Sequence, residues 1–393
     1  MTPSILIIGG GMAGVASAWF LAQSGARVLL LERGKTFGWL TTGASLQAVR
    51  AQFSDPVNIA FMTDSLAFYE QFGQRLDLPG YDIGFHQQGY LFITSEEAAI
   101  PALRQRVAFQ HRHGLSDVEF LEHDELHHRF PFLAPEALAA TFRQRDGWLS
   151  AHEALDGFRR AARRLDDGRR AEFRLNTSVE GFIQAGGRVT GVITPDGRLE
   201  ADAVVIACGP FSGLVAQMAG GELSIEAVRR HRLVIGEHHL IPGWAPMTID
   251  HDTGAHWRPE GPGAALAWAE PEPATPPSFD VRPDPNFPFR MLEGVYRLCP
   301  FWGDVAETLP RSQVFLHAGQ YDMTPDHNPL IGPVPGLEGL WVNAGYSGHG
   351  VMAAPGGARL LADLLIGARP LAGNPFAPDR PFAHEGEAEK MVI

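Results

Sequence analysis

The chain opens on the stretch SILIIGGGMAG at residues 4–14, and RVLLLE follows at residues 27–32. The two apolar runs, SILII and RVLLL, are typical of neighbouring parallel strands that are buried on both faces. Between them, residues 16–24 predict a helix. The order strand, glycine turn, helix, strand and acidic residue predicts the nucleotide-binding unit of a doubly wound α/β fold.

The glycines of this first turn have separate mechanical roles. Gly9 allows the tight turn, Gly11 lets the backbone approach a pyrophosphate, and Gly14 lets the helix pack closely on the strand. The pyrophosphate then lies at the helix N-terminus, where unpaired N–H groups and the helix dipole favour an anion. Glu32 is placed to accept hydrogen bonds from an adenosine ribose, which argues against a 2′-phosphate. NAD, NADP and FAD remain open from this motif alone.

The composition narrows the class of protein. With 393 residues, 45% of them hydrophobic, the chain has room for two domains. A net charge of −13 without a basic stripe argues against nucleic acid as a partner. The sequence has no run of about 18 apolar residues, so we expect no transmembrane helix. The two cysteines, Cys208 and Cys299, and the 16 histidines form neither a disulfide framework nor a metal site, which favours a cytoplasmic protein without a metal.

A second glycine turn lies far along the chain. Residues 339–343 (GLWVN) predict a strand, residues 345–350 read GYSGHG, and residues 353–366 predict a helix. One sheet then presents two helix N-termini. This arrangement suits a ligand with two electron-rich regions, a pyrophosphate and an anionic ring.

We expect two domains and a tail. A discontinuous dinucleotide-binding domain takes residues 1–80, 145–220 and 320–372, and a mainly antiparallel β domain that binds the substrate takes residues 81–144 and 221–319. Residues 373–393 are expected to form an extended tail. Within these parts, residues 81–94 predict a hairpin, residues 36–53 a loop followed by a helix, and residues 229–300 strands with long loops.

Several motifs resemble one known family over nearly the whole chain. They are GGGMAG with Glu32 and Arg33, GAS at residues 43–45, Asp146–Gly147, ADAVVIACGPFS at 201–212, MTPDHNPLIG at 323–332 and AGYSGHGVMAAP at 344–355. In this order they resemble the FAD-dependent amine and amino-acid oxidoreductases of the D-amino-acid oxidase superfamily. The likeness is strongest to the branch of sarcosine oxidase, sarcosine and dimethylglycine dehydrogenases, glycine oxidase and the flavin subunits of bacterial proline dehydrogenases.

The resemblance implies that FAD lies extended across a Rossmann-like sheet. It assigns the ADP half to Gly9, Gly11, Met12, Ala13, Gly14, Glu32 and Arg33, the pyrophosphate region to Ala44, Ser45 and Leu46, the adenine to Val179, closure of the site to Gly209, and the flavin ring to Gly345, Ser347, Gly348, His349, Gly350, Val351 and Met352. A helix N-terminus at the flavin N1/O2 edge agrees with the negative charge of the reduced ring.

The chain also departs from the family. Residues 318–320 (AGQ) hold no cysteine before Tyr321, and residues 41–49 (TTGASLQAV) hold no histidine, so we expect FAD to be bound without a covalent link. Met352 stands where sarcosine oxidases have a carboxylate-binding lysine, and no lysine lies between Lys35 and Lys390. These differences favour a dehydrogenase over an oxidase, with an electron-acceptor protein or quinone as its partner.

The reaction implied is the oxidation of a small primary or secondary amino acid, with hydride transfer to flavin N5 to give an imine. Arg50 is the candidate carboxylate anchor, Tyr321 an active-site aromatic residue, and His349 a donor beside the flavin. His256, Trp257, Trp268, Tyr296 and Arg297 are weaker candidates, most of them expected in the core. Two alternatives remain: a FAD-binding subunit or assembly factor without turnover, and a NAD-dependent dehydrogenase.

Overall fold

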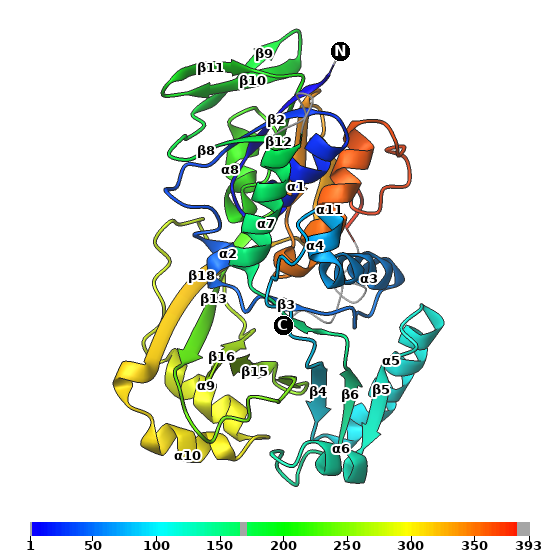
Figure 1. The fold of residues 1–393 in the computed structure, drawn as a ribbon, viewed down its shortest axis with the longest axis vertical. Helices are drawn as coiled ribbons and strands as arrows, with labels where there is room; N and C mark the ends of the chain where they lie inside the picture. The colour runs from blue at the N-terminus through cyan, green and yellow to red at the C-terminus, as the bar shows by residue number, and fades with distance from the viewer. Residues whose placement is uncertain (1, 166–170, 383–393) are drawn as a thin grey trace.

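The computed structural model describes residues 2–165 and 171–382, which form two large sheets placed one above the other (Figure 1). The upper sheet has six strands in the order β19, β20, β12, β1, β2, β8. All neighbours pair in parallel except β19 and β20. The bounds are β1 Ser4–Ile8, β2 Arg27–Leu31, β8 Ala171–Arg174, β12 Ala203–Ile206, β19 Leu330–Pro333 and β20 Leu340–Ala344.

Both faces of the upper sheet are covered, which explains why its strands are apolar throughout. Ile5 and Ile7 pack in a core with the helices α1 (Met12–Gln23), α3 (Pro56–Glu70), α7 (Ala151–Arg164) and α11 (Gly350–Leu365). Leu6 and Ile8 pack on the other face, toward the small sheet of β9 (Gly181–Ala185), β10 (Arg188–Thr194) and β11 (Gly197–Glu200), and toward α8 (Ser212–Gln217).

The lower sheet has nine strands, in the order β17, β13, β16, β15, β14, β4, β6, β5, with β18 also paired to β13. The bounds are β4 Tyr90–Thr94, β5 Glu119–Glu122, β6 Ala139–Arg143, β13 Glu226–Ile235, β14 Met247–Asp250, β15 Ala255–Glu260, β16 Gly263–Trp268, β17 Ala274–Thr275 and β18 Val314–Met323. Its pairings are antiparallel except β4 with β14. The two sheets together confirm the predicted α/β fold with a mainly antiparallel second sheet.

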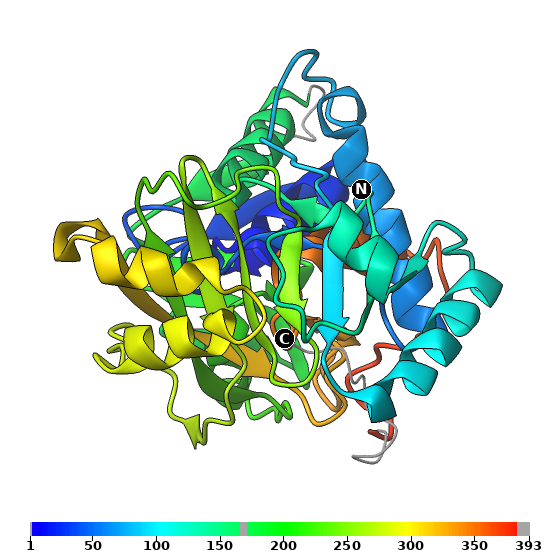
Figure 2. The same cartoon turned by 90° about the horizontal axis from the view of Figure 1, so that it is seen from below.

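The two faces of the lower sheet differ in character. Leu91, Leu233 and Trp257 belong to an apolar core that packs on α9 (Phe287–Tyr296), α10 (Phe301–Thr308) and α6 (His123–Arg129). Figure 2 shows the yellow helices α9 and α10 lying across this side of the sheet. Side chains alternate between the two faces along a strand, so the residues next to these in the sequence lie on the opposite face. Polar side chains on that face reach the upper half of the molecule.

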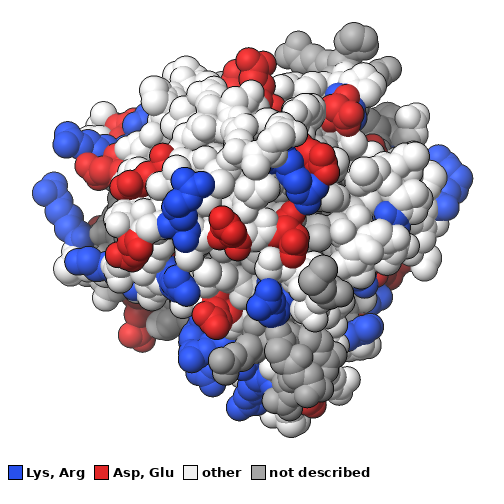
Figure 3. Space-filling model, turned by 90° about the horizontal axis from the view of Figure 1, so that it is seen from above, with Lys and Arg blue, Asp and Glu red and all other residues white. Residues whose placement is uncertain are grey.

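The remaining described elements lie within and between these two halves. They are α2 (Thr41–Ala44), β3 (Ala48–Val49) paired with β7 (Gly147–Trp148), α4 (Phe72–Arg75), α5 (Ile100–Arg112) and the 3₁₀ turns at Glu97–Ala99, Gly209–Phe211 and Arg311–Gln313. None of the described helices has the length and apolar character needed to cross a membrane. On the face seen in Figure 3, acidic and basic side chains are interspersed.

Three local predictions are wrong. The hairpin expected over residues 81–94 is a single strand, β4, whose partners β6 and β14 come from elsewhere in the chain. The helix expected within residues 36–53 is limited to α2, because the chain then turns into β3. The region 229–300, expected to hold strands and loops, contains the helix α9. A proline lies in its first turn, where proline is compatible with a helix. Of the predicted tail, residues 383–393 lie outside the described part.

Candidate active site

The turn between β1 and α1 requires glycine on its protein side. Gly9 has a φ of +112°, and a Cβ there would lie 2.3 Å from the carbonyl oxygen of Ala207. A Cβ on Gly14 would lie 2.0 Å from the carbonyl oxygen of Gly9. A Cβ on Gly11 would meet only the Thr42 hydroxyl oxygen, at 3.5 Å. The turn is therefore packed tightly against the sheet and open on the side where a ligand approaches.

Glu32 fastens this turn to the end of β2. Its Oε2 accepts the N–H of Gly10 at 2.7 Å, and its Oε1 accepts the N–H of Gly34 at 2.5 Å and the indole N–H of Trp39 at 3.0 Å. A carboxylate has about four acceptor positions. One position therefore remains for an outside donor such as a ribose hydroxyl.

The turn between β20 and α11 is held by Asp322. The carboxylate accepts the N–H of Gly345 at 2.7 Å, and the Asp322 carbonyl accepts the N–H of Ser347 at 3.0 Å. Ser347 is fully buried with a φ of +50°, a conformation that costs energy for a residue other than glycine. A Cβ on Gly348 would lie 2.5 Å from the Tyr321 ring. Burial raises the pKa of Asp322 to about 6, which the backbone N–H donors oppose.

A cavity lies between the two turns. The N-terminal ends of α1 and α11, capped at Gly11 and His349 without a side-chain cap bond, both border it. Its lining also includes Glu32, Trp39, Thr42, Cys208, Pro210, Tyr321, Asp322 and Tyr346. Two positive helix ends and open glycine turns fit an extended dinucleotide with an anionic ring.

Arg50 lies beside His349, the residue that precedes α11. Its side chain is fully buried, and its guanidinium carbon lies 4.0 Å from the centroid of the Phe53 ring. One guanidinium nitrogen lies 3.5 Å from Nε2 of His349, and another donates to the carbonyl oxygen of Gln52. Two of the three predicted catalytic residues, Arg50 and His349, are thus in contact.

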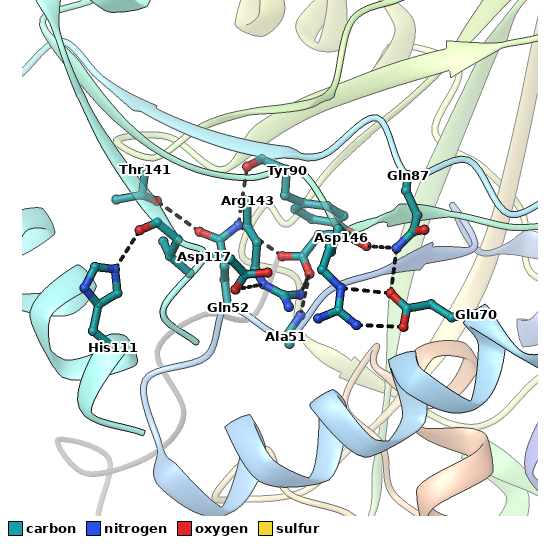
Figure 4. A network of polar contacts seen from close by, with 12 residues as sticks. Ala51, Gln52, Glu70, Gln87, Tyr90, His111, Asp117, Thr141, Arg143 and Asp146 are labelled. Carbon is teal, nitrogen blue, oxygen red and sulfur yellow. Dashed lines mark hydrogen bonds and ion pairs between the residues drawn. The ribbon is translucent and has the colours of Figure 1, made fainter. Parts of the chain in front are cut away.

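A buried polar network holds the residues that follow Arg50 (Figure 4). The fully buried carboxylate of Asp146 accepts the Ala51 N–H at 3.0 Å, the Gln52 side-chain amide at 3.1 Å and the Arg143 guanidinium at 2.6 Å. Arg143 also donates to Asp117 at 2.8 Å. Burial raises the pKa of Asp146, and the charge and hydrogen bond of Arg143 lower it. The network fixes the backbone that carries Arg50.

The lower sheet supplies the opposite wall of the site. Tyr90 is buried and Tyr321 is half-buried, and neither hydroxyl forms a hydrogen bond within the described part of the chain. His256 donates from Nδ1 to the Gly254 carbonyl at 2.7 Å, and burial lowers its pKa to about 4, so it is neutral at pH 7. Burial also lowers the pKa of Arg258 to about 10. This wall offers hydroxyl groups and positive charge.

The predicted cofactor residues divide into a lining and its support. The lining holds Gly9, Gly11, Met12, Ala13, Glu32, Ser45, Gly209, Gly348, Gly350 and Val351, together with Tyr321. The supporting residues pack around it: Gly14 on Gly9, Ala44 against Gly319, Leu46 through its carbonyl to Arg258, and Gly345, Ser347, His349 and Met352 within or just after the second turn. Arg33 lies 3.8 Å from the Phe279 ring centroid, and Val179 packs on the core beneath β12.

Thr41 and Thr42 also line the cavity and were not among the predicted site residues. The Thr42 hydroxyl accepts the N–H of Met12 at 3.2 Å, and the Thr41 hydroxyl donates to the Gln320 carbonyl at 2.9 Å, which joins the first turn to β18. Adjacent hydroxyl residues in a glycine-rich loop are a recognisable signal for such contacts. No local pattern marks Trp39 as a partner of Glu32, because the contact depends on the path of the whole loop.

The fold combines a parallel sheet whose two glycine turns suit an extended dinucleotide with a second, mainly antiparallel sheet. The chain belongs to the family of FAD-dependent oxidoreductases whose family model, DAO, matches residues 4–364. FAD is therefore the cofactor, and the two glycine turns are the candidate site for it.

Three relatives illustrate the similarity. Glycine oxidase of Pseudomonas aeruginosa is 29% identical over 386 residues, which are 96% of this chain and 99% of the relative. FAD-dependent oxidoreductase domain-containing protein 1 of Bos taurus is 27% identical over 404 residues, 92% of this chain and 81% of the relative. The crystal structure of L-proline dehydrogenase from P. horikoshii has a TM-score of 0.83 at 25% identity, over 94% of this chain and 95% of that one.

Proposed function

We propose that the protein oxidises the amine of a small amino acid to an imine. The observation that carries the proposal is the buried Arg50 guanidinium, which lies beside His349 at the start of α11. A guanidinium in such a place binds a carboxylate in two-point contact and so sets the orientation of an amino acid. Glycine oxidase and L-proline dehydrogenase, two proteins similar to this chain, support a substrate of this class.

The residues of the chain orient the substrate and keep water out. Arg50 holds the carboxylate, while the Tyr90 and Tyr321 hydroxyls offer hydrogen bonds to the amine, which reacts in its neutral form. FAD, when bound, supplies the hydride acceptor. The N-terminus of α11 stabilises the negative charge that develops at the flavin edge. A strong general base is not required, and burial, which lowers the pKa of His256 to about 4, makes this imidazole a weak base.

We further propose that FAD is held without a covalent bond and that electrons leave to an acceptor protein or quinone. Met352, at the position of the lysine in sarcosine oxidases, is buried in the apolar core. No lysine lies between Lys35 and Lys390 to activate oxygen. A dehydrogenase is therefore favoured over an oxidase. The cytoplasmic location stays a prediction from the sequence.

Anaerobic mixing of the FAD-loaded protein with a panel of amines tests the proposed function. The panel comprises sarcosine, proline, glycine and D-amino acids, and the readout is loss of the absorbance of oxidised flavin. At least one of them is expected to bleach the flavin. If none does, the second candidate function, a FAD-binding subunit without turnover, gains support from the missing lysines.

A further inference from the structure

One face of the lower sheet holds more positive than negative charge. Arg230 and Arg232 lie two residues apart on β13, and the pairing of Val234 with Ala265 and of Ala265 with Arg258 places Arg258 on the same face. One carboxylate serves two of these guanidinium groups, because Glu260 contacts Arg258 and lies 3.7 Å from Arg232. The face therefore carries uncompensated positive charge.

Arg230 forms no ion pair within the described part of the chain. One of its guanidinium nitrogens donates to the carbonyl oxygen of Arg229 at 2.9 Å, while its buried Nε has no hydrogen-bond partner there. The carboxylates that influence it most are held by others. Glu272 accepts three hydrogen bonds from Arg229, at 3.0, 3.1 and 3.3 Å, and Glu270 accepts two from Arg290, at 3.0 and 3.1 Å.

A largely buried guanidinium without an acidic partner is costly, so an anion from outside the chain is the natural complement. Burial lowers the pKa of Arg230, and the attraction of Tyr321 and the two glutamates opposes this. The group still carries its charge at neutral pH, because arginine titrates far above this range.

Arg230 lies against Tyr321, a residue of the cofactor cavity. Its guanidinium carbon lies 5.6 Å from the centroid of the Tyr321 ring, which lines that cavity and contacts Gly348. The two neighbouring arginines point to the loop beside the cofactor instead. Arg258 donates to the Leu46 carbonyl at 2.9 Å, and Arg232 to the Gly43 carbonyl at 3.5 Å. Arg230 is the member of this cluster left for the substrate.

We propose that Arg230 binds a second carboxylate of the substrate, so that the amine belongs to a dicarboxylate. Arg50 then binds the carboxylate next to the amine, and Arg230 binds the distal one across the Tyr321 ring. This inference rests on the proposed function, since it assumes that an amino acid lies between the two arginines. N-Methylaspartate and iminodiacetate are representatives of the class.

Binding of unreactive acids tests the proposal without turnover. Succinate and butyrate are titrated into the FAD-loaded protein, and the Kd is read from the shift of the flavin absorbance. A charge-assisted hydrogen bond predicts that the wild type binds succinate about 10-fold or more tighter than butyrate. Arg230→Gln is expected to remove this preference, and Arg230→Lys to keep part of it. Arg282→Gln, on a side chain that is 89% exposed, is the matched control and is expected to keep it all.

Equal affinity for the two acids in the wild type, or no binding of either, would overturn the proposal. A preference for succinate that survives in Arg230→Gln would also overturn the proposal. If that variant loses affinity for FAD and keeps the preference for succinate, Arg230 serves the cofactor and not the substrate. The amine panel separates the two ideas. If monocarboxylic amines bleach the flavin fully and N-methylaspartate does not, the oxidation proposal stands and the dicarboxylate proposal fails.

Discussion

Replacing Asp146 by asparagine tests how the backbone beside Arg50 is held. The wild-type carboxylate is fully buried and accepts hydrogen bonds from Ala51, Gln52 and Arg143. Asparagine has nearly the same shape, but it has one acceptor oxygen and a donor amide in place of two acceptors. One of the three donors then faces another donor, and the buried Arg143 loses one of its two carboxylate partners.

The loss is expected to reach about 3 kcal/mol of unfolding free energy. Removing one partner of a buried ion pair costs about 3–5 kcal/mol, because the other charge is left in the interior. The lower end applies here, since Arg143 keeps its contact to Asp117 at 2.8 Å. Asp117→Asn is the matched control. That carboxylate is 39% exposed, so its removal is expected to cost about 1 kcal/mol or less.

Urea unfolding of the FAD-loaded variants, at one fixed excess of FAD, measures this difference. The midpoint of Asp146→Asn is expected to fall with an unchanged slope, and its affinity for butyrate is expected to fall as well, because the backbone next to Arg50 is released. A cost below about 1 kcal/mol, or an equal cost for Asp117→Asn, would refute the view that Asp146 holds this segment.

Three further outcomes are expected. Gly14→Ala is expected to purify with little or no FAD, because its Cβ would lie 2.0 Å from the Gly9 carbonyl oxygen. Gly213→Ala, whose Cβ would have no atom nearer than 3.6 Å, is the control and is expected to keep its FAD. Normal flavin content in Gly14→Ala would contradict the close packing of this turn. Acid precipitation is expected to leave the yellow colour in the supernatant, and a coloured pellet would show a covalent link. Burial raises the pKa of Asp322 to about 6, above its value in the unfolded chain. Between about pH 4 and pH 6 the folded protein therefore binds more protons than the unfolded chain, and its stability falls as the pH rises through that window. Asp322→Asn lacks this term, so its unfolding free energy relative to wild type is expected to improve on the order of 2–3 kcal/mol from about pH 4 to pH 7, and a difference that does not change with pH would contradict the assignment.

The parts of the fold that depend on local chemistry were predictable. The strands β1 and β2 and the turn at Gly9 follow from apolar runs around a glycine turn, because a strand buried on both faces has no polar positions. The hairpin over residues 81–94 failed for the opposite reason. The aromatic residues of β4 serve pairings with residues 139–143 and 247–250, and no pattern within the segment reveals such distant partners.

The candidate site divides in the same way. The resemblance to a family brought Arg50 and His349 into one site although 299 positions separate them. It did not distinguish Arg230 from Arg229 or Arg232, which are similar in sequence context. Only the register of β13 against β16 and β18 shows which of these side chains face the cofactor half of the molecule. Sequence patterns specify an element, and sheet register specifies where its charges lie.

Product analysis of a single anaerobic turnover tests the central claim most directly. The FAD-loaded protein is mixed with its best amine substrate in the absence of oxygen, and reduced flavin, carbonyl product and released amine are measured together. Amine oxidation predicts one carbonyl group for each flavin reduced, since the imine hydrolyses, and one released amine where the substrate is not cyclic. Arg50→Gln is expected to raise the substrate concentration needed. Flavin that stays oxidised with every amine, or is reduced without a carbonyl product, would contradict the account.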